Sequence, residues 1–229
     1  MVDIQENIRR VEERIAQACH RAGRSPSEVT LIVVTKTVTP PAIYQAFAAG
    51  LRNFGENRVQ EAQPKLQELA DLPDFSRDLT TWHMVGHLQT NKVKAAIELF
   101  NVIHSVDSLK LAQALDRNAR VPLPVLVQVN MAGEATKSGF PPAEARAAVE
   151  TVGRLPNLKL SGLMTIAPIV ANPEETRPVF RQLHLLCVGL GLPELSMGMT
   201  DDFEVAIEEG ATMVRIGRAI FGERPVEGR

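Results

Sequence analysis

The sequence of 229 residues has only two cysteines, no excess of basic charge and no long apolar run. Cys19 and Cys187 fall on the apolar faces of predicted helices, which favours buried reduced thiols over a disulfide. No CxxC or HExxH pattern occurs, so no metal is expected. The formal net charge of -2 provides no basic surface for nucleic acid or an anionic membrane, and we expect neither as a partner.

Membrane-spanning segments are also not expected. No apolar stretch approaches the roughly 20 residues that cross a bilayer, and the N-terminus begins with charged residues instead of the apolar core of a signal peptide. We therefore expect a cytoplasmic protein. Hydrophobic residues make up 45% of the chain, which is enough for one sizeable core, and we expect a single domain over residues 1–229.

Short apolar runs alternate with amphipathic stretches along the whole chain. The run 29–36 is rich in β-branched residues and is typical of a strand that is buried on both faces. A helix is predicted before it, over about 4–23, and another after it, from Thr39-Pro40 to Gly50. Seven further strands are predicted at 53–56, 81–86, 101–106, 125–130, 159–166, 194–199 and 213–217, with helices beginning near 57, 89, 108, 142, 173, 200 and 218.

Eight such units predict an α/β fold, a single (β/α)8 barrel of the TIM type. An open doubly wound sheet is the main competitor, but no GxGxxG follows the first strand. Functional residues of these barrels lie at the carboxyl ends of the strands. The residues expected there are Lys36, Asn57, His87 with Gln89 and Asn91, Ser105 with Asp107, Asn130, Thr165, Thr200 with Asp201, and Arg215 with Gly217.

Lys36 ends the first predicted strand on the same face as Ile32 and Val34. If that face lines the barrel, burial favours a neutral amine, which is the form that attacks an aldehyde to make a Schiff base. The alternative is a solvated lysine at the barrel rim, or one that pairs with a carboxylate such as Glu56. Position alone leaves both open.

The ends of the last two predicted strands could form an anion site. Such barrels often bind phosphate between the loops after these strands and the N-terminus of a short extra helix. Gly217 would let the backbone approach closely, and the glycine and hydroxyls of 196–200 could complete the cradle. Thr200 followed by Asp201 and Asp202 is, however, also typical of an ordinary helix cap that needs no ligand.

Arg215 falls inside the eighth predicted strand, where a guanidinium is costly without a partner. A carboxylate from a neighbouring strand is one candidate partner. The ring nitrogen of a pyridine cofactor is another. With Lys36 for an aldehyde and the cradle for a phosphate, the second candidate makes a coherent site for pyridoxal 5′-phosphate (PLP).

Eight motifs follow one another in a fixed order. They are Thr35-Lys36-Thr37, Phe54-Gly-Glu-Asn57, Trp82-His-Met-Val-Gly-His-Leu-Gln-Thr-Asn-Lys92, Lys137-Ser-Gly139, Gly162-Leu-Met-Thr165, Leu195-Ser-Met-Gly-Met-Thr-Asp-Asp202, Met213-Val-Arg-Ile-Gly217 and Ile220-Phe-Gly222. In this order and spacing they resemble the pyridoxal phosphate homeostasis protein family over nearly the whole chain. The resemblance implies a barrel similar to the N-terminal domain of alanine racemases, which is a PLP fold type III barrel, without the C-terminal β domain.

The resemblance also implies the cofactor contacts. PLP is expected on Lys36, with Asn57 beside it and Arg215 facing the pyridine nitrogen. The phosphate is expected to be held by Ser196, Met199, Thr200, Gly217 and Arg218.

Two positions carry open alternatives within that resemblance. Arg218 stands where the family commonly has Thr or Ser, so a hydroxyl contact to phosphate is lost, and the guanidinium either replaces or crowds it. Lys137, in a predicted loop, is either a solvated charge or an amine that engages phosphate or passes PLP onward.

The implied function is intracellular PLP homeostasis, with PLP held as a Schiff base by a carrier or buffer that has no efficient catalytic activity. PLP-dependent apoenzymes are candidate recipients, and the missing second domain favours a monomer. An amino-acid racemase of the alanine racemase type is the alternative, but it needs an acid/base on each face of the cofactor. The only tyrosine, Tyr44, is predicted on a helix. A third hypothesis is a cofactor-free aldolase, in which Glu56 or His87 would assist Lys36.

Overall fold

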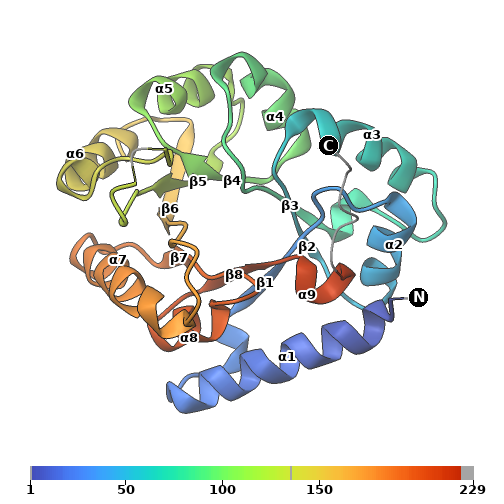
Figure 1. Ribbon diagram of the computed structural model, residues 1–229. Coiled ribbons are helices and arrows are strands. Elements are labelled where there is room, and N and C mark those ends of the chain that lie inside the picture. The colour runs from blue at the N-terminus through green and yellow to red at the C-terminus, as the bar shows by residue number, and fades with distance from the viewer. Residues whose placement is uncertain (1, 135, 223–229) are drawn as a thin grey trace.

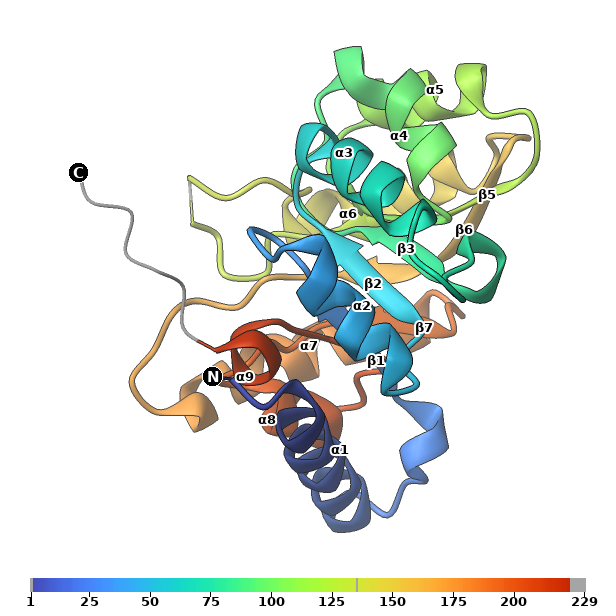
Figure 2. The ribbon, with the colours of Figure 1, turned by 90° about the vertical axis from the view of Figure 1, so that its right-hand side faces the viewer.

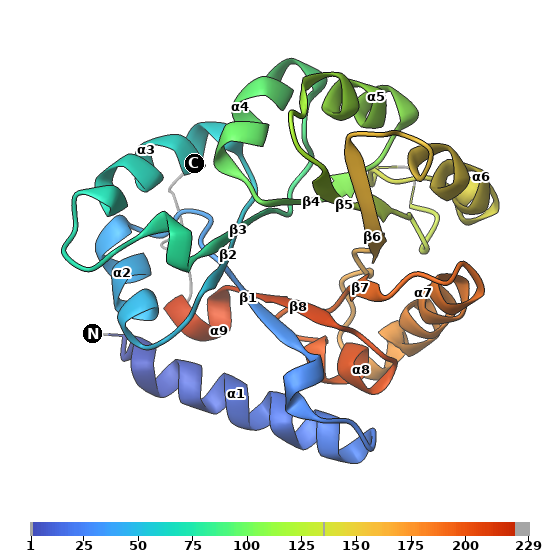
Figure 3. The same cartoon turned by 180° about the vertical axis from the view of Figure 1, so that it is seen from behind.

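The computed structural model describes residues 2–134 and 136–222. Eight parallel strands close into a barrel in chain order, and β8 pairs back to β1 (Figure 1). Helices form an outer ring, which is visible from both ends of the barrel in Figures 1 and 3. The predicted (β/α)8 fold is confirmed. The predicted domain of 1–229 extends past the described residues at both ends, and its boundaries stay a prediction.

The strands lie where the apolar runs predicted them. Their bounds are β1 Thr30–Val34, β2 Asn53–Glu56, β3 Thr81–Met84, β4 Val102–Val106, β5 Leu123–Gln128, β6 Leu158–Met164, β7 Glu194–Ser196 and β8 Met213–Ile216. Several predicted strands were too long at the carboxyl end, because the chain leaves the sheet there to form loops. These carboxyl ends meet at one end of the barrel, which we call the mouth. Lys36 lies in such a loop, beyond the end of β1.

The helices also follow the sequence pattern. Their bounds are α1 Ile4–Arg21, α2 Pro40–Ala48, α3 Val59–Ala70, α4 Val93–Leu99, α5 Leu109–Asn118, α6 Pro142–Val152, α7 Arg177–Gly189, α8 Phe203–Glu208 and α9 Arg218–Phe221, with 3-10 turns at Pro26–Glu28, Arg77–Leu79, Thr90–Lys92 and Pro173–Thr176. The end of α2 confirms the expected glycine cap. Gly50 adopts a φ of 101°, its N–H donates to Phe47 O at 3.0 Å, and Leu51 N–H donates to Ala46 O at 3.1 Å.

The N-terminal helix α1 covers the part of the barrel wall that the short α9 leaves open. It packs against α2, α8 and α9 (Figure 2). The Asn7 side chain donates to Ile220 O at 3.0 Å. The face predicted for this helix is buried, including Ile8, Val11 and Cys19. Cys19 and Cys187 are buried free thiols, as predicted, and burial raises the pKa of Cys187 to about 11. No helix among the described residues is long and apolar enough to cross a membrane.

Alternation along β1 separates an outer core from the barrel interior. Val33 belongs to the apolar core. Ile32 faces the interior, where a Cβ added to Gly55 would lie 3.0 Å from it. The side chains at even-numbered positions of β1 therefore point into the interior of the barrel.

Gly162 of β6 allows β6 and β7 to approach closely. A Cβ at this position would lie 2.0 Å from the Glu194 carbonyl oxygen, which is backbone and cannot turn away. We expect Gly162→Ala to lower the free energy of unfolding by roughly 1–3 kcal/mol, measured by urea denaturation. Gly189→Ala is the matched control, because its nearest neighbour is the flexible tip of Arg146 at 3.9 Å. The control should be neutral or stabilising by up to about 1 kcal/mol, and equal effects of the two changes would contradict the close approach.

Candidate functional site

The end of β1 directs Lys36 toward the mouth. Thr35 points outward, and its hydroxyl donates to Glu56 Oε1 at 2.7 Å. Lys65 of α3 donates to the same oxygen at 2.7 Å. Lys36 follows in the turn beyond β1 and is half-buried, and the alternation of β1 favours the inner side for it. The alternative in which Lys36 pairs with Glu56 is wrong, since Glu56 is buried outside the barrel wall and pairs with Lys65.

A tight turn follows Lys36 immediately. Val38 N–H donates to Thr35 O at 2.9 Å and closes it. Thr37 has a φ of 62°, a conformation that costs a β-branched residue of order 1 kcal/mol or more. Its hydroxyl donates to the Lys36 carbonyl at 2.6 Å, and its N–H donates to Glu61 at 3.4 Å. The turn holds the half-buried Lys36 in place at the mouth.

Arg215 of β8 lies inside the barrel and is 5% exposed. Its Nη1 donates to Ser196 Oγ at 2.7 Å, and its Nη2 donates to Thr165 O at 2.8 Å. No carboxylate among the described residues forms an ion pair with it, so the carboxylate alternative from the sequence is wrong. Burial lowers the pKa of Arg215 to about 10, against the opposing effect of the Asp202 charge. A guanidinium has five N–H donors, so others remain for an acceptor above it.

Two histidines extend this polar interior to the far wall. His104 Nδ1 lies 2.9 Å from Ser196 Oγ, and its Nε2 lies 2.9 Å from His83 Nδ1. His83 Nε2 lies 3.2 Å from Asn53 Oδ1. Burial lowers the pKa of His83 to about 4, and burial, His83 and Arg215 together lower the pKa of His104 well below its usual value. Both rings are therefore neutral near pH 7.

The sequence reasoning missed His104 and Asn53. It nominated the adjacent Ser105 instead. The Ser105 hydroxyl is buried and has no hydrogen-bond partner among the described residues. The register of β4 shifts between Ile103 and Val106, which both belong to the apolar core, so alternation along the sequence could not decide between His104 and Ser105.

The loop between β7 and α8 differs from the predicted helix cap. The helix begins at Phe203 with Asp202 as its N-cap, so Thr200 is not the cap. The buried Asp202 carboxylate accepts from Met199 N–H at 2.6 Å, and burial raises the pKa of Asp202. Gly198 has a φ of 90° and packs on α8, where a Cβ would meet Ala206 at 2.5 Å. This glycine is needed for packing on the helix.

The start of α9 lies against the end of β1. A Cβ at Gly217 would be 2.8 Å from the Val34 carbonyl oxygen. The N–H groups of Arg218 and Ala219 have no acceptor among the residues that the structure describes. The Arg218 guanidinium donates to both oxygens of Asp201 at 2.5 Å, so it neutralises one of the two acids that would repel a phosphate.

Other nominated residues lie around the mouth. Asn57 is half-buried after β2, and a Cβ at Gly86 would lie 2.3 Å from its carbonyl oxygen. His87 Nδ1 pairs with Asp107 at 2.6 Å. Lys137 donates to Glu134 at 2.7 Å and to the Ala167 carbonyl at 3.1 Å, so it ties two mouth loops together.

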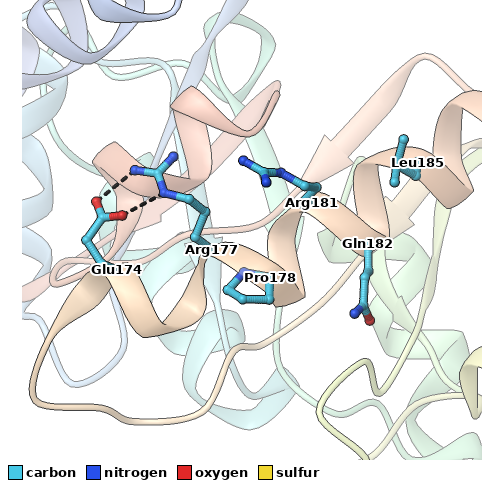
Figure 4. A pocket seen from close by; sticks show the side chains of 6 residues that line it. All are labelled: Glu174, Arg177, Pro178, Arg181, Gln182 and Leu185. Carbon is cyan, nitrogen blue, oxygen red and sulfur yellow. Dashed lines mark hydrogen bonds and ion pairs between the residues drawn. The ribbon is translucent and has the colours of Figure 1, made fainter.

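A hollow on the outer surface does not belong to this site. Figure 4 shows it along α7 and the preceding turn, lined by Glu174, Arg177, Pro178, Arg181, Gln182 and Leu185. Arg177 donates to Glu174, Glu208 and Glu209, and Arg181 donates to Glu209. These arginines already have carboxylate partners and offer no free cation to a ligand.

The residues at the mouth fit PLP. The strands β7, β8 and β1 are neighbours (Figure 1). Lys36, Arg215 and the start of α9, which follow or belong to β1 and β8, therefore share one sector of the barrel. They supply an amine, a buried guanidinium without a carboxylate, and free N–H groups suited to an anion. Each matches one part of the cofactor.

Fold and site together define the class of barrels that resemble the alanine racemase N-terminal domain. The family model described as alanine racemase, N-terminal domain, matches residues 3–225. Alanine racemase of Clostridium difficile 630 shares the fold, with a TM-score of 0.70 at 15% identity over 97% of this chain and 58% of that one.

The chain belongs to the pyridoxal phosphate homeostasis protein family. It is 48% identical to the Pseudomonas aeruginosa protein of that name, over 98% of this chain and 97% of that one. The Aquifex aeolicus protein is 46% identical, over 96% and 97%. The structure of PipY from Synechococcus elongatus PCC7942 with PLP bound has a TM-score of 0.78 at 41% identity, over 93% of this chain and 100% of that one. The family resemblance is confirmed.

The neutral histidine pair predicts a stability that falls in mild acid. Above a pH of about 6.5 the rings are neutral in both folded and unfolded chains and contribute nothing. As the pH falls below that value, His83 and His104 bind protons in the unfolded chain but not in the folded chain. The free energy of unfolding should drop by about 1.4 kcal/mol per pH unit for each histidine, until the folded ring titrates.

Urea unfolding between pH 7 and pH 5 measures this drop. His83→Gln and His104→Gln are the comparison variants, because each removes one buried imidazole and should remove that ring's share of the drop. A pH dependence of stability that neither change alters would show that the pair is not held neutral, and this comparison cancels the contributions of carboxylates such as Asp202.

Proposed function

We propose that this chain binds PLP at the barrel mouth, as a Schiff base on Lys36, and serves intracellular PLP homeostasis as a carrier or buffer. The observation that carries the proposal is Arg215, a buried guanidinium that has no carboxylate partner among the described residues and lies in the same sector as Lys36. Support comes from the homeostasis proteins that this chain resembles and from PipY, whose structure has PLP bound.

In this proposal each part of the cofactor has its own partner. Lys36 holds the aldehyde carbon, and Arg215 donates to the pyridine nitrogen. The phosphate lies over the start of α9, at Gly217 and Arg218, with the half-buried Thr200 beside it. Asn57 flanks the cofactor from β2.

We revise two further contacts that the family resemblance implies. The Ser196 hydroxyl is engaged by Arg215 and His104, so we assign Ser196 to the pyridine end of the site and not to the phosphate. Met199 N–H is occupied by Asp202, and it reaches a phosphate only if that carboxylate turns away.

The same residues favour a protein that holds PLP over an enzyme that uses PLP to turn over a substrate. An arginine at the ring nitrogen favours its unprotonated form, which weakens PLP as an electron sink. Tyr44 lies on α2, with its ring centroid 6.3 Å from that of Phe47, so it does not face Lys36 from across the cofactor. Glu56 lies outside the wall. A racemase and a Glu56-assisted aldolase are both disfavoured, and we propose a monomeric cytoplasmic carrier that supplies apoenzymes.

Absorption spectroscopy tests the binding of PLP. The wild-type protein loaded with PLP should show the visible band of a Schiff base, which borohydride abolishes. Lys36→Arg keeps the cation but should lose the band, because a guanidinium does not condense with the aldehyde. Lys137→Ala is the matched control at the mouth and should keep the band. A wild-type protein with no band in the presence of PLP would refute the proposal.

Two assays on the loaded protein separate a carrier from an enzyme. Racemisation of alanine should stay far below the turnover of about 10 per second that is the median for enzymes. PLP should move from the loaded protein to a PLP-dependent apoenzyme and restore its activity. Racemisation at an ordinary enzymatic rate would favour the racemase instead.

A further inference from the structure

We propose that His83 and His104 are positioning residues for Arg215. They belong to one hydrogen-bond chain across the barrel interior, whose members in order are Arg215, Ser196, His104, His83 and Asn53. All hydrogen bonds of this hydrogen-bond chain are donated in the same direction, from Arg215 toward Asn53. The hydrogen-bond chain holds the guanidinium so that its free N–H groups face the bound ring. This inference rests on the proposed PLP site.

The direction of the hydrogen-bond chain follows from its first donor, the Arg215 guanidinium. A guanidinium only donates, so Ser196 Oγ accepts from Arg215. The single hydroxyl proton of Ser196 must then go to His104 Nδ1, which lies 2.9 Å away. Ser196 is fully buried, and the structure gives this proton no other acceptor among the described residues.

The remaining protons are then determined in turn. A neutral His104 that accepts at Nδ1 carries its proton on Nε2 and donates it to His83 Nδ1, 2.9 Å away. His83 in turn carries its proton on Nε2 and donates it to Asn53 Oδ1 at 3.2 Å. Every proton between the guanidinium and the amide has an acceptor.

The opposite direction leaves a proton unbonded. If His104 Nδ1–H donated to Ser196, the serine oxygen would receive two donors, and its own buried proton would have no acceptor. A buried donor without a partner is unfavourable. Protonation of His104 would add a second charge near Arg215, and protonation of His83 would leave another buried charge without a carboxylate partner among the described residues.

Arg215 is held at two corners of its plane, and the hydrogen-bond chain provides one of them. Nη1 is held by Ser196, whose hydroxyl is oriented by His104, and Nη2 is held by the Thr165 carbonyl. Loss of His104 would free the serine hydroxyl to rotate and would release one corner. The guanidinium would then spend less time aimed at the ring nitrogen of PLP.

Nuclear magnetic resonance of the imidazole nitrogens tests the direction in protein freed of PLP. Both His83 and His104 should be neutral, with the proton on Nε2 and a bare Nδ1, and should stay so from pH 8 to pH 6. A proton on Nδ1 of either ring, or titration near pH 6.5, would overturn the proposal. This measurement does not depend on PLP binding. It therefore distinguishes an error in the proposed hydrogen-bond chain from an error in the proposed PLP-binding function.

Variants test the positioning of Arg215. His104→Leu breaks the hydrogen-bond chain and should weaken PLP binding about tenfold, with a shifted visible band. His104→Gln retains an acceptor and a donor, and it should restore most of the affinity and most of the band position. Ser105→Ala is the matched control on the same strand, because it removes a hydroxyl that has no partner among the described residues. Urea unfolding of each variant distinguishes a loss of folding stability from a loss of the orientation of the Arg215 guanidinium.

If His104→Leu does not fold, Ser196→Ala disconnects Arg215 from both histidines and is expected to give the same shift. PLP affinity and spectrum equal to those of Ser105→Ala, in whichever of these variants folds, would overturn the positioning role.

Discussion

The buried guanidinium of Arg215 is the constraint around which the rest of the site is arranged. A charge inside a barrel is costly, and no carboxylate among the described residues forms an ion pair with it. Its bound N–H groups instead meet neutral oxygens, one from Ser196 and one from the Thr165 carbonyl. The guanidinium therefore retains N–H donors with no partner among the described residues, which suit the lone pair of a pyridine nitrogen.

The barrel converts this constraint into a binding site through the order of its strands. Because β8 pairs with both β7 and β1, the guanidinium, the start of α9 and Lys36 share one sector of the mouth. Two of the acids near this sector have cationic partners, since Glu56 pairs with Lys65 outside the wall and Asp201 pairs with Arg218. The buried Asp202 accepts from the neutral Met199 N–H, and its charge acts on Arg215 without a direct ion pair.

The sequence predicted the architecture because each strand and helix is encoded locally. The β-branched run before Lys36, the glycine after α2 and the apolar face of α1 each indicated their element without any knowledge of the others. Arg215 was identified for a similar reason, since a charge in a buried strand is unusual wherever it occurs. Strand ends were less well predicted, because the chain leaves the sheet where the mouth loops begin.

The hydrogen-bond partners inside the barrel could not be predicted in this way. His104 and Ser196 are 92 residues apart, and closure of the barrel brings them together. The choice of Lys65 over Lys36 as the partner of Glu56 depends on which side of the wall each side chain occupies. Likewise, the turn of Asp202 back to Met199 depends on how the loop packs on α8 through Gly198.

The central claim is that Lys36 is the residue that holds PLP. Borohydride reduction of the PLP-loaded protein, followed by proteolysis and mass spectrometry, tests this claim most directly. The account predicts a phosphopyridoxyl group on Lys36 and on no other lysine at one equivalent of PLP. Labelling of Lys137 or another lysine in place of Lys36 would contradict it.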